Sequence, residues 1–565
     1  MTSLNLKLFR DLRHLSGQVL AVMLVVACGM ASYITMRSAY ESLVVSQAEY
    51  YRESRFAEIF AQVKRAPESL VARLAAIPGV AQVDTRVVFE VSLDVPGLEE
   101  PATGRLVSIP EKYRPRLNDL HLREGRYIEP RQRDEVLISQ AFASANRLKI
   151  GDTFGAILNG RRQQLRIVGI AISPEYVYEI RGVEVFPDNR RFGVLWMSRE
   201  VLGPAFDLKE GFNDLSLSLS PGAIPAEVIA QLDRLLEDYG GLGAYGRDEQ
   251  ISHRFLSDEI AQDRVTGFFI PSIFLGIAAF LIHIILSRMI ALQRPQIGLL
   301  KAFGYSRWSI GGHYLKFALV IIAGGSLLGF ALGIWFGTYL AEMYSRFFHF
   351  PALRFRTTPS LIGWALLISG GSACLGALAA VRKAAALPPA EAMRPEPPAR
   401  FRTGWLERLG WQGLFHPAVR MILRNLARKK AKAFLSVFGI AWAVAILVVG
   451  FYGFDAIDYI MKVQFGIIQR EDATVLFHNP RPARVRYDLN HLPGVKESET
   501  FRLVPARLRF GHRSKRLGVL GLSPDGRLRS LVDSRLRPLS LPSEGIVLNT
   551  KLAEILGVSA GDDCR

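Results

Sequence analysis

The sequence predicts a membrane α-helical protein: one four-span unit, then the first span of a second unit, with an α/β domain inserted outside the membrane in each. Three observations predict this class. Five apolar stretches are each long enough to cross a bilayer, and their apolar cores, residues 17–36, 265–286, 317–341, 360–381 and 433–454, contain no Asp, Glu, Lys or Arg. Lysine and arginine gather in alternate connections between these stretches. Short motifs recur at separations of about 410 to 415 residues.

The composition of the 565-residue chain supports several domains rather than one. Hydrophobic residues make up 49% of it, yet the net charge is +18. Such a charge suggests nucleic-acid binding when it covers a soluble face. Here the basic residues flank apolar stretches, so no nucleic-acid partner is expected. Cys28 and Cys374 lie within apolar stretches and Cys564 is penultimate, a spacing that fits neither a metal site nor a disulfide framework.

The five apolar stretches predict five transmembrane helices, because unpaired backbone groups are costly in the hydrocarbon core. The predicted spans cover residues 17–37, 263–287, 314–341, 360–382 and 433–456. The first stretch shows no cleavage site, and a similar stretch recurs later in the chain. It is therefore predicted to be a retained anchor rather than a signal peptide.

The basic connections set the predicted orientation. Residues 1–16, 288–313 and 383–432 carry the excess of Lys and Arg and fall on one side if the spans alternate. The positive-inside rule places that side, and with it the N-terminus, in the cytoplasm of a bacterial cell, with the spans in its inner membrane. The extracytoplasmic parts are then residues 38–262, 342–359 and 457–565. Residues 1–16 and, within the basic linker, residues 419–430 are predicted as amphipathic elbow helices at the membrane surface.

Residues 38–262 are predicted to form a mixed α/β domain on helical stalks. Helices are predicted at 40–63, which would continue the first span, and at 66–76, 226–239 and 248–262. Pro225 suits the first position of the third of these helices. Strands are predicted at 82–93, 105–109, 135–139 and 163–172, with a turn at Gly151-Asp152-Thr153 before a further strand.

Four glycines stand four residues apart in the third predicted span: Gly325, Gly329, Gly333 and Gly337. This spacing places them on one helix face, where small residues let two backbones approach closely in lipid. Tight helix packing is the main interpretation. A sliding surface between moving helices is the alternative.

The recurring motifs predict a duplication. The residues before the first span, 8–12, match 422–426, and the 77–80 segment IPGV matches LPGV at 492–495. The turn at Gly151-Asp152 matches Gly561-Asp562. Three further spans are expected of the second copy and do not occur, so the chain is predicted to be a fragment or a truncated reading frame of a longer protein.

The connection after the second span holds the most informative motif, RPQIGLLKAFGYSRWSI at residues 294–310. Its periodicity predicts a short helix on which Ile297, Leu300, Lys301 and Gly304 present an apolar patch with basic edges. Such a patch suits a groove on a cytosolic partner or the lipid surface, and periodicity alone does not separate the two.

This segment resembles the loop after the second span of FtsX/MacB/LolC-type ABC permeases, with the approximate pattern R-x-x-E-I-G-x-L-K/R-A-x-G. Gln296 stands where that family usually has Glu. The 389–394 segment PAEAMR resembles the P-x-E-A-L-R segment that ends the family's membrane unit. The resemblance implies a MacB-like extracytoplasmic fold and a coupling helix that docks on the ATPase. The coupling residues it implies are Gln296, Ile297, Gly298, Leu299, Leu300, Lys301, Ala302, Gly304 and Tyr305.

The resemblance also implies a function. The chain is expected to be a permease subunit that couples ATP hydrolysis by a separate, dimeric ABC ATPase to extracytoplasmic work on a lipophilic substrate, lipoprotein or peptide. Membrane lipids and a periplasmic adaptor protein are the other implied partners. No G-x-x-x-x-G-K-[ST], H-E-x-x-H or G-x-S-x-G motif occurs, so no catalytic residue, metal or cofactor is expected. The alternative is a membrane sensor or scaffold that regulates proteins such as cell-wall hydrolases without transport.

Overall fold

The computed structural model describes residues 3–181, 187–353, 355–386, 388–389, 393, 430–477, 481–511, 513–524 and 526–563. Most of the predicted basic linker, the PAEAMR segment and the predicted second elbow helix lie outside the described residues. The chain divides into two compact units. The first comprises Met1–Ala57, Arg86–Lys209 and Arg247–Val444, and the second comprises Glu58–Thr85, Glu210–Gly246 and Ala445–Arg565.

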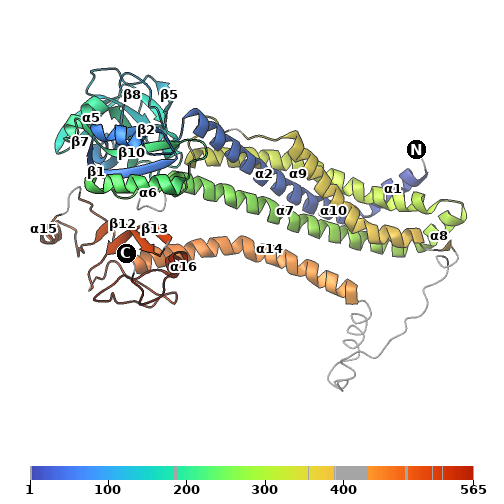
Figure 1. The fold of residues 1–565 in the computed structure, drawn as a ribbon. Coiled ribbons are helices and arrows are strands. Elements are labelled where there is room, and N and C mark those ends of the chain that lie inside the picture. The colour runs from blue at the N-terminus through green and yellow to red at the C-terminus, as the bar shows by residue number, and fades with distance from the viewer. Residues whose placement is uncertain are drawn as a thin grey trace. The chain divides into compact units, whose positions relative to one another are not determined.

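Four long helices form a bundle in the first unit (Figure 1). They are α2 (Ser16–Glu53), α7 (Ile251–Leu292), α9 (Arg307–Phe347) and α10 (Pro359–Ala386). Two short helices, α1 (Ser3–His14) and α8 (Arg294–Ala302), lie at one end of the bundle. In the part of the chain that the structure describes, five helices are long and apolar enough to span a membrane: these four and Val437–Ile468. The last comprises most of α14 (Lys430–Val463) and a π-helical turn, Gln464–Ile468.

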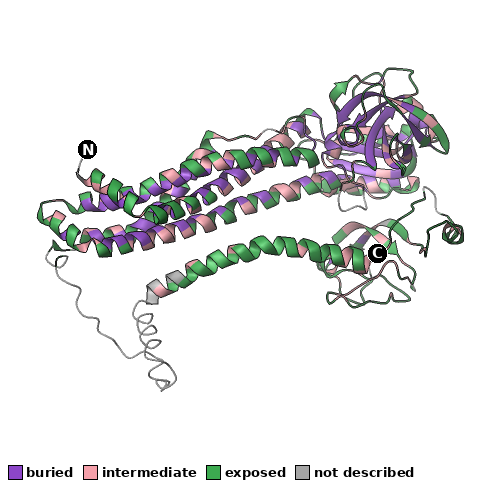
Figure 2. Ribbon diagram, turned by 180° about the vertical axis from the view of Figure 1, so that it is seen from behind, coloured by how far each residue is buried: buried purple, intermediate pink, exposed green. Residues whose placement is uncertain are grey.

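The bundle has an apolar core and an apolar exterior. Val26, Ile34, Phe317 and similar side chains are buried between the helices. The outer faces of the same helices stay exposed in Figure 2, and they carry large apolar groups such as Leu327 and Leu375. Contiguous exposed apolar surface of this extent is rare on soluble monomers and suits contact with lipid. The candidate spans are therefore apolar on both faces, as a membrane requires.

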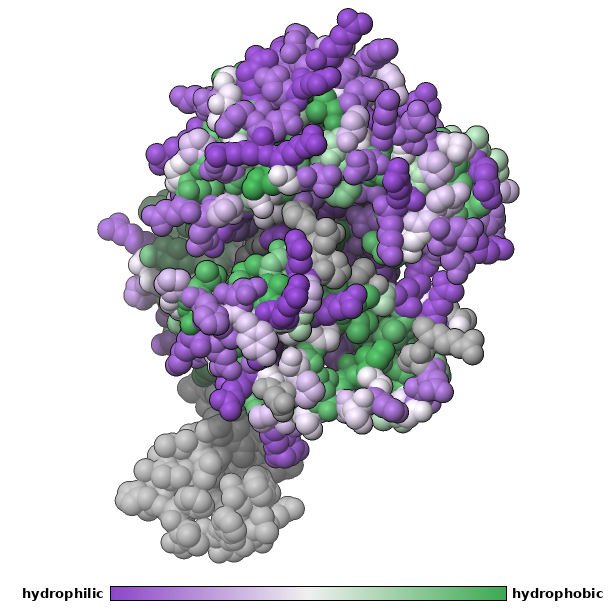
Figure 3. All heavy atoms as spheres, turned by 90° about the vertical axis from the view of Figure 1, so that its left-hand side faces the viewer, coloured by the Kyte–Doolittle hydropathy of each residue, from purple (hydrophilic) through white to green (hydrophobic). Residues whose placement is uncertain are grey.

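A mixed seven-stranded sheet lies at the other end of the first unit. Its strands are β3 (Val88–Asp94), β4 (Ala102–Ile109), β5 (His121–Gly125), β6 (Glu135–Ser139), β7 (Thr153–Leu158), β8 (Arg161–Ile172) and β9 (Phe192–Ser198). Their order is β5-β8-β6-β9-β4-β3-β7, and β7 also pairs with the first half of β8, so the sheet closes on itself. The β4–β9 and β6–β8 pairs are parallel. Polar and charged side chains cover most of the surface seen from this end (Figure 3).

Short helices complete the closed sheet. They are α4 (Gln140–Asn146) and α5 (Arg199–Ala205), with 3-10 turns η2 (Pro174–Tyr176) and η4 (Arg247–Glu249). Phe142 of α4 and Leu202 of α5 are buried in the apolar core with strand residues such as Phe154 and Leu195. The helices therefore close the core of the sheet without adding further strands.

The second unit contains a four-stranded sheet of order β11-β1-β10-β2. Its strands are β1 (Ile59–Pro67), β2 (Val80–Arg86), β10 (Gly211–Leu219) and β11 (Tyr245–Gly246). Two helices, α3 (Val71–Ala75) and α6 (Pro225–Leu236), and the 3-10 turns η1 (Glu68–Leu70) and η3 (Glu237–Tyr239) accompany it. Val228, Leu232 and Leu236 of α6 pack into the core of this sheet. The unit also holds α15 (Val485–Asn490), the antiparallel hairpin β12 (Arg502–Phe510) and β13 (Arg513–Gly521), and α16 (Thr550–Leu556).

The predicted helix over residues 40–63 is wrong beyond Glu53. Arg55 has φ 50°, and the backbone N–H groups of Asn118 and Asp119 donate to the carbonyls of Arg55 and Ser54 at 3.1 and 2.8 Å. The turn sends the chain into β1, which is hydrogen-bonded on both sides. The predicted helix at 66–76 shrinks to η1 and α3 for the same reason, and the predicted strand at 82–93 is two strands in different sheets.

Local structure recurs at the separation found in the sequence. The N–H of Lys149 donates to Asp152 Oδ2 at 2.8 Å, and the N–H of Ser559, about 410 positions later, donates to Asp562 Oδ2 at 2.8 Å. Gly151 and Gly561 have φ of 94° and 99° in these turns, a conformation that favours glycine. The two matched segments therefore form the same turn.

Candidate functional site

The helix α8 joins α7 to α9 and has defined start and stop signals. Pro295 lies in its first turn, where the missing N–H costs no helical hydrogen bond. At its end the N–H of Tyr305 donates to Leu300 O and the N–H of Gly304 donates to Lys301 O, both at 3.1 Å, which is a Schellman motif. Gly304 has φ 91° and so supplies the left-handed residue that this motif needs.

One face of α8 is buried against the bundle. Ile297 is 1% exposed, Gly298 is buried, and Leu300 and Tyr305 pack against the same apolar core. The prediction that Ile297 and Leu300 form an outward patch is therefore wrong. A helix that crosses the end of a bundle must bury its most apolar stripe, and the bundle is the nearest apolar surface.

The opposite face carries a different apolar set. Leu299 is 52% exposed, Phe303 is 73% exposed and Trp308, in the first turn of α9, is 90% exposed. We call these three residues the docking face. Gln296, Ala302 and Gly304 are also exposed beside it. Phe303 and Trp308 were missing from the residues predicted from sequence, although both belong to the same motif.

Lys301 ties α8 to α10. Its Nζ donates to the carbonyls of Ala384 and Ala385 at 3.1 and 2.9 Å, in the last turn of α10. Carbonyls there lack helical partners, and the helix dipole attracts a cation. Burial, and then the charge of Arg307, lowers the pKa of Lys301. The ammonium group of Lys301 therefore binds within the chain, while the residue itself stays partly exposed.

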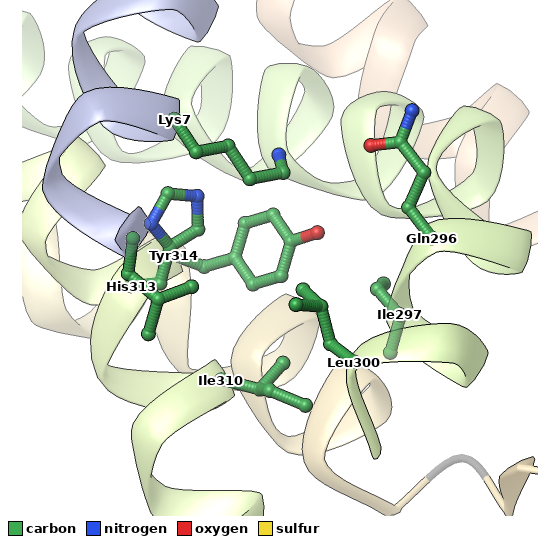
Figure 4. A pocket seen from close by; sticks show the side chains of 8 residues that line it. Lys7, Gln296, Ile297, Leu300, Ile310, His313 and Tyr314 are labelled. Atoms are coloured by element: carbon green, nitrogen blue, oxygen red, sulfur yellow. The ribbon is translucent and has the colours of Figure 1, made fainter. Parts of the chain in front are cut away.

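A small pocket lies behind α8. Its lining comes from α1, α8 and α9: Leu4, Lys7, Gln296, Ile297, Leu300, Ile310, His313 and Tyr314. Figure 4 shows Lys7, His313 and Tyr314 around the same space as Ile297 and Leu300. Among the described residues, no group of His, Cys, Asp or Glu is arranged to hold a metal ion. The pocket therefore marks the place where α1, α8 and α9 meet.

The sheet end of the bundle is fixed to the sheet through residues 173–181, which we call the junction segment. The N–H of Tyr178 donates to Ser252 Oγ of α7 at 2.8 Å, and Gln250 Nε2 donates to Glu175 O at 2.7 Å. The N–H of His349, just beyond α9, donates to Val177 O at 2.8 Å. The helices α7 and α9 therefore both hold this segment.

Two buried carboxyl groups lie in the junction segment. Glu175 forms a buried ion pair with Arg86, including a bond of 3.0 Å from Arg86 Nη2. Glu179 is fully buried and accepts a hydrogen bond from Ser139 Oγ of β6 at 2.7 Å. Burial raises the pKa of Glu179 to about 8, since desolvation disfavours the charged form. Glu179 is therefore largely protonated at neutral pH.

The glycine stripe lies along α2 for most of its length. A Cβ on Gly325 would meet Met23 O at 2.7 Å, one on Gly329 would meet Met30 Cβ at 2.5 Å, and one on Gly333 would meet Ile34 Cβ at 2.8 Å. A Cβ on Gly337 would instead meet the ring of Phe355 at 2.1 Å. The first three glycines permit close approach of α9 to α2.

Family models match two parts of the chain. The FtsX-like permease C-terminal model matches residues 268–389, which hold most of α7, all of α8 and α9, and α10. The MacB-like periplasmic core domain model matches residues 19–235.

Among solved structures, one similar structure is the extracellular domain of the noncanonic ABC-type transporter YknZ from Gram-positive bacteria. It has 17% identity and a TM-score of 0.23, and the match covers 33% of this chain and 97% of that one. Another is the periplasmic region of MacB from Actinobacillus actinomycetemcomitans. It has 13% identity and a TM-score of 0.24, and the match covers 38% of this chain and 97% of that one. No curated protein matches the chain.

Proposed function

Because the chain is an ABC-transporter permease of the FtsX/MacB type, we propose that it couples ATP hydrolysis by a separate, dimeric cytosolic ATPase to mechanical work outside the membrane. The work acts on a lipophilic substrate, lipoprotein or peptide. In this proposal α1 and α8 face the bacterial cytoplasm and the closed sheet projects outward from the inner membrane. The excess of Lys and Arg in residues 1–16 and 288–313 supports this orientation.

The docking face is the observation that carries the proposal. Leu299 and Phe303 stand four residues apart on α8, so they share one side of the helix, and Trp308 follows at the start of α9. Burying an exposed Leu or Phe fully contributes roughly 1.5–3 kcal/mol. A helix that presents such anchors fits a groove on a partner protein. The permease needs no ATPase motif of its own if this face binds the ATPase.

Mechanical transmission is supported by the way α8 is held. Lys301 fixes one end of α8 to α10, and the joints at both ends continue into α7 and α9. The helix α7 has 42 residues and α9 has 41, and each runs without a break from the α8 end to the junction segment. A displacement of α8 therefore has two helical paths to the sheet.

The proposal is tested by co-purification. Phe303→Asp places a charge on the docking face, and Tyr113→Asp is its control, since Tyr113 is a 60% exposed aromatic residue near the closed sheet. An ABC ATPase of the kind that serves FtsX/MacB-type permeases is expressed with each variant in membranes. We expect Phe303→Asp to reduce the recovered ATPase at least about tenfold, which corresponds to the loss of one anchor.

The control variant should recover as much ATPase as the unmodified chain. Equal recovery with Phe303→Asp would refute docking through this face. That result would leave α8 as a helix on the lipid surface and would favour the sensor or scaffold function instead.

A further inference from the structure

Gln293 is the joint between α7 and α8. It ends α7 and also precedes the first residue of α8, with φ −92° and ψ 13°. Its side chain caps neither α7 nor α8. The amide group is therefore available to other helices at the point where α8 would rotate against α7.

Two other helices hold this amide at both its ends. Lys7 Nζ of α1 donates to Gln293 Oε1 at 2.7 Å, and Tyr314 OH of α9 donates to the same oxygen at 3.1 Å. Gln293 Nε2 donates to Asp11 Oδ1 of α1 at 3.1 Å. Rotation of α8 about its joint would break these bonds unless α1 and α9 moved with it.

The amide partners Asp11 and Tyr314 are buried, as is His313 beside Asp11. Asp11 is 8% exposed, His313 5% and Tyr314 1%. Lys7 Nζ lies 2.5 Å from Asp11 Oδ2, and His313 Nε2 lies 3.5 Å from the same oxygen. His313 Nε2 forms no hydrogen bond at this distance and acts on Asp11 through its position alone. Bonded polar groups in a dry environment favour one arrangement, because they are costly to leave unpaired.

The charge state of Asp11 agrees with this arrangement. Burial alone would raise the pKa of Asp11, but the neighbouring His313 and Lys7 outweigh burial and lower it. Asp11 is therefore a carboxylate that accepts from Lys7 and Gln293, and it cannot itself donate.

We propose that Lys7, Asp11, Gln293, His313 and Tyr314 form a clamp that fixes the α7–α8 joint to α1. The N-terminal helix α1 is then a positioning element of the coupling apparatus, in addition to an amphipathic anchor at the membrane surface. The clamp makes α1, α8 and the start of α9 move as one body. Its consequence for coupling rests on the proposed function, because the orientation of α8 matters to an ATPase only if α8 docks on it.

Moving the carboxylate within the clamp tests this inference. Gln293→Glu puts a second carboxylate beside Asp11, and the two repel each other. Asp11→Asn removes the ion pair with Lys7. In the double variant, the new amide at position 11 donates to the new carboxylate at position 293, which still accepts from Lys7 and Tyr314. One carboxylate and every bond to position 293 are then retained. If Asp11 and Gln293 instead stabilised the fold independently of each other, the effects of the two substitutions would add. The double variant would then be more disturbed than either single variant.

The first readout needs no ATPase. Spin labels are placed at Leu6→Cys on α1 and Ala302→Cys on α8, both exposed positions, with Cys28, Cys374 and Cys564 replaced by Ser. The distance between the labels is measured by pulsed electron paramagnetic resonance on the full chain in lipid nanodiscs. We expect one narrow distribution for the unmodified pair, a distribution at least about twice as wide for each single variant, and a narrow one again for the double variant. Two results would overturn the clamp: distance distributions of equal width in all proteins, or a distribution in the double variant as wide as those of the single variants.

The second readout uses the same ABC ATPase as the co-purification experiment. ATPase binding should change less than about twofold in all variants, because the docking face is untouched. ATP hydrolysis stimulated by the permease should fall about tenfold in each single variant and recover in the double variant, since a buried unpaired polar group disturbs the joint. Unchanged stimulation in the single variants would overturn the coupling role of α1. If the unmodified chain binds no ATPase while the distances behave as expected, the proposed function fails and the clamp stands.

Discussion

The substitution Gly329→Ala tests the close approach of α2 and α9. The added methyl carbon would lie 2.5 Å from Met30 Cβ and 2.7 Å from the carbonyl oxygen of Ala27. Ordinary contact between such atoms begins near about 3.4 Å, so the helices must separate by nearly 1 Å or distort. Neither neighbour is the free end of a flexible side chain, because one is a Cβ and the other belongs to the backbone.

The magnitude follows from two opposing effects. Forcing a methyl group into a packed interface costs about 1–3 kcal/mol. Replacing glycine by alanine inside a helix returns up to about 1 kcal/mol. The steric overlap should outweigh the gain in helix propensity at Gly329, with a net destabilisation of about 1–2 kcal/mol. Gly312→Ala is the matched control in the same helix, since a Cβ there meets nothing within 4 Å. It should be neutral or slightly stabilising.

The assay is equilibrium unfolding of the full chain in mixed micelles with increasing sodium dodecyl sulfate. The unfolding midpoint of Gly329→Ala should fall below that of the unmodified chain, and the midpoint of Gly312→Ala should not. Equal midpoints for the two variants would refute the argument that the glycine stripe exists for backbone approach.

The other predictions concern the junction segment and the end of α8. The pKa of Glu179 lies at about 8 instead of the usual 4.5, so the stability it contributes is present below about pH 4.5 and is lost as the pH rises to about 8. Glu179→Gln should remove this dependence and raise the free energy of unfolding at pH 8 by a few kcal/mol at most, which is measured as a higher unfolding temperature at that pH; a pH profile as steep as that of the unmodified chain would contradict it. Gly304→Ala should destabilise the folded chain by roughly 1–2 kcal/mol, because the left-handed backbone there penalises a side chain. Thermal unfolding checks this, with Ala302→Gly as the control that changes helix propensity alone. Lys301→Met should loosen α8 from α10, seen as faster hydrogen exchange in α8; unchanged exchange would argue against this tie.

Hydropathy placed five long apolar helices in the sequence, because lipid imposes a strict length and composition on a span. Each predicted span lies within one long helix, such as 263–287 within α7. The ends were less predictable. Nothing in residues 54–63 forbids a helix, and the change to β1 depends on pairing with β10, about 150 residues later. Long-range pairing of this kind leaves no local signal.

The strand β9 and the faces of α8 show two further limits. All seven residues of β9 are buried, so it lacks the alternation that predicts a strand, and it was not predicted. Along α8, Ile297 and Leu299 are both apolar, and periodicity cannot tell which one meets the bundle. Only the packing of α1, α9 and α10 around α8 assigns Ile297 to the core and Leu299 to the docking face.

The most direct test of the account is photo-cross-linking from the two faces of α8. A benzoylphenylalanine is placed at Phe303, on the docking face, or at Ile297, in the bundle core, and membranes that contain the co-expressed ABC ATPase are irradiated. The account predicts an adduct with the ATPase from position 303 and none from position 297. Adducts of position 303 with lipid alone, or ATPase adducts from position 297 only, would contradict docking through this face.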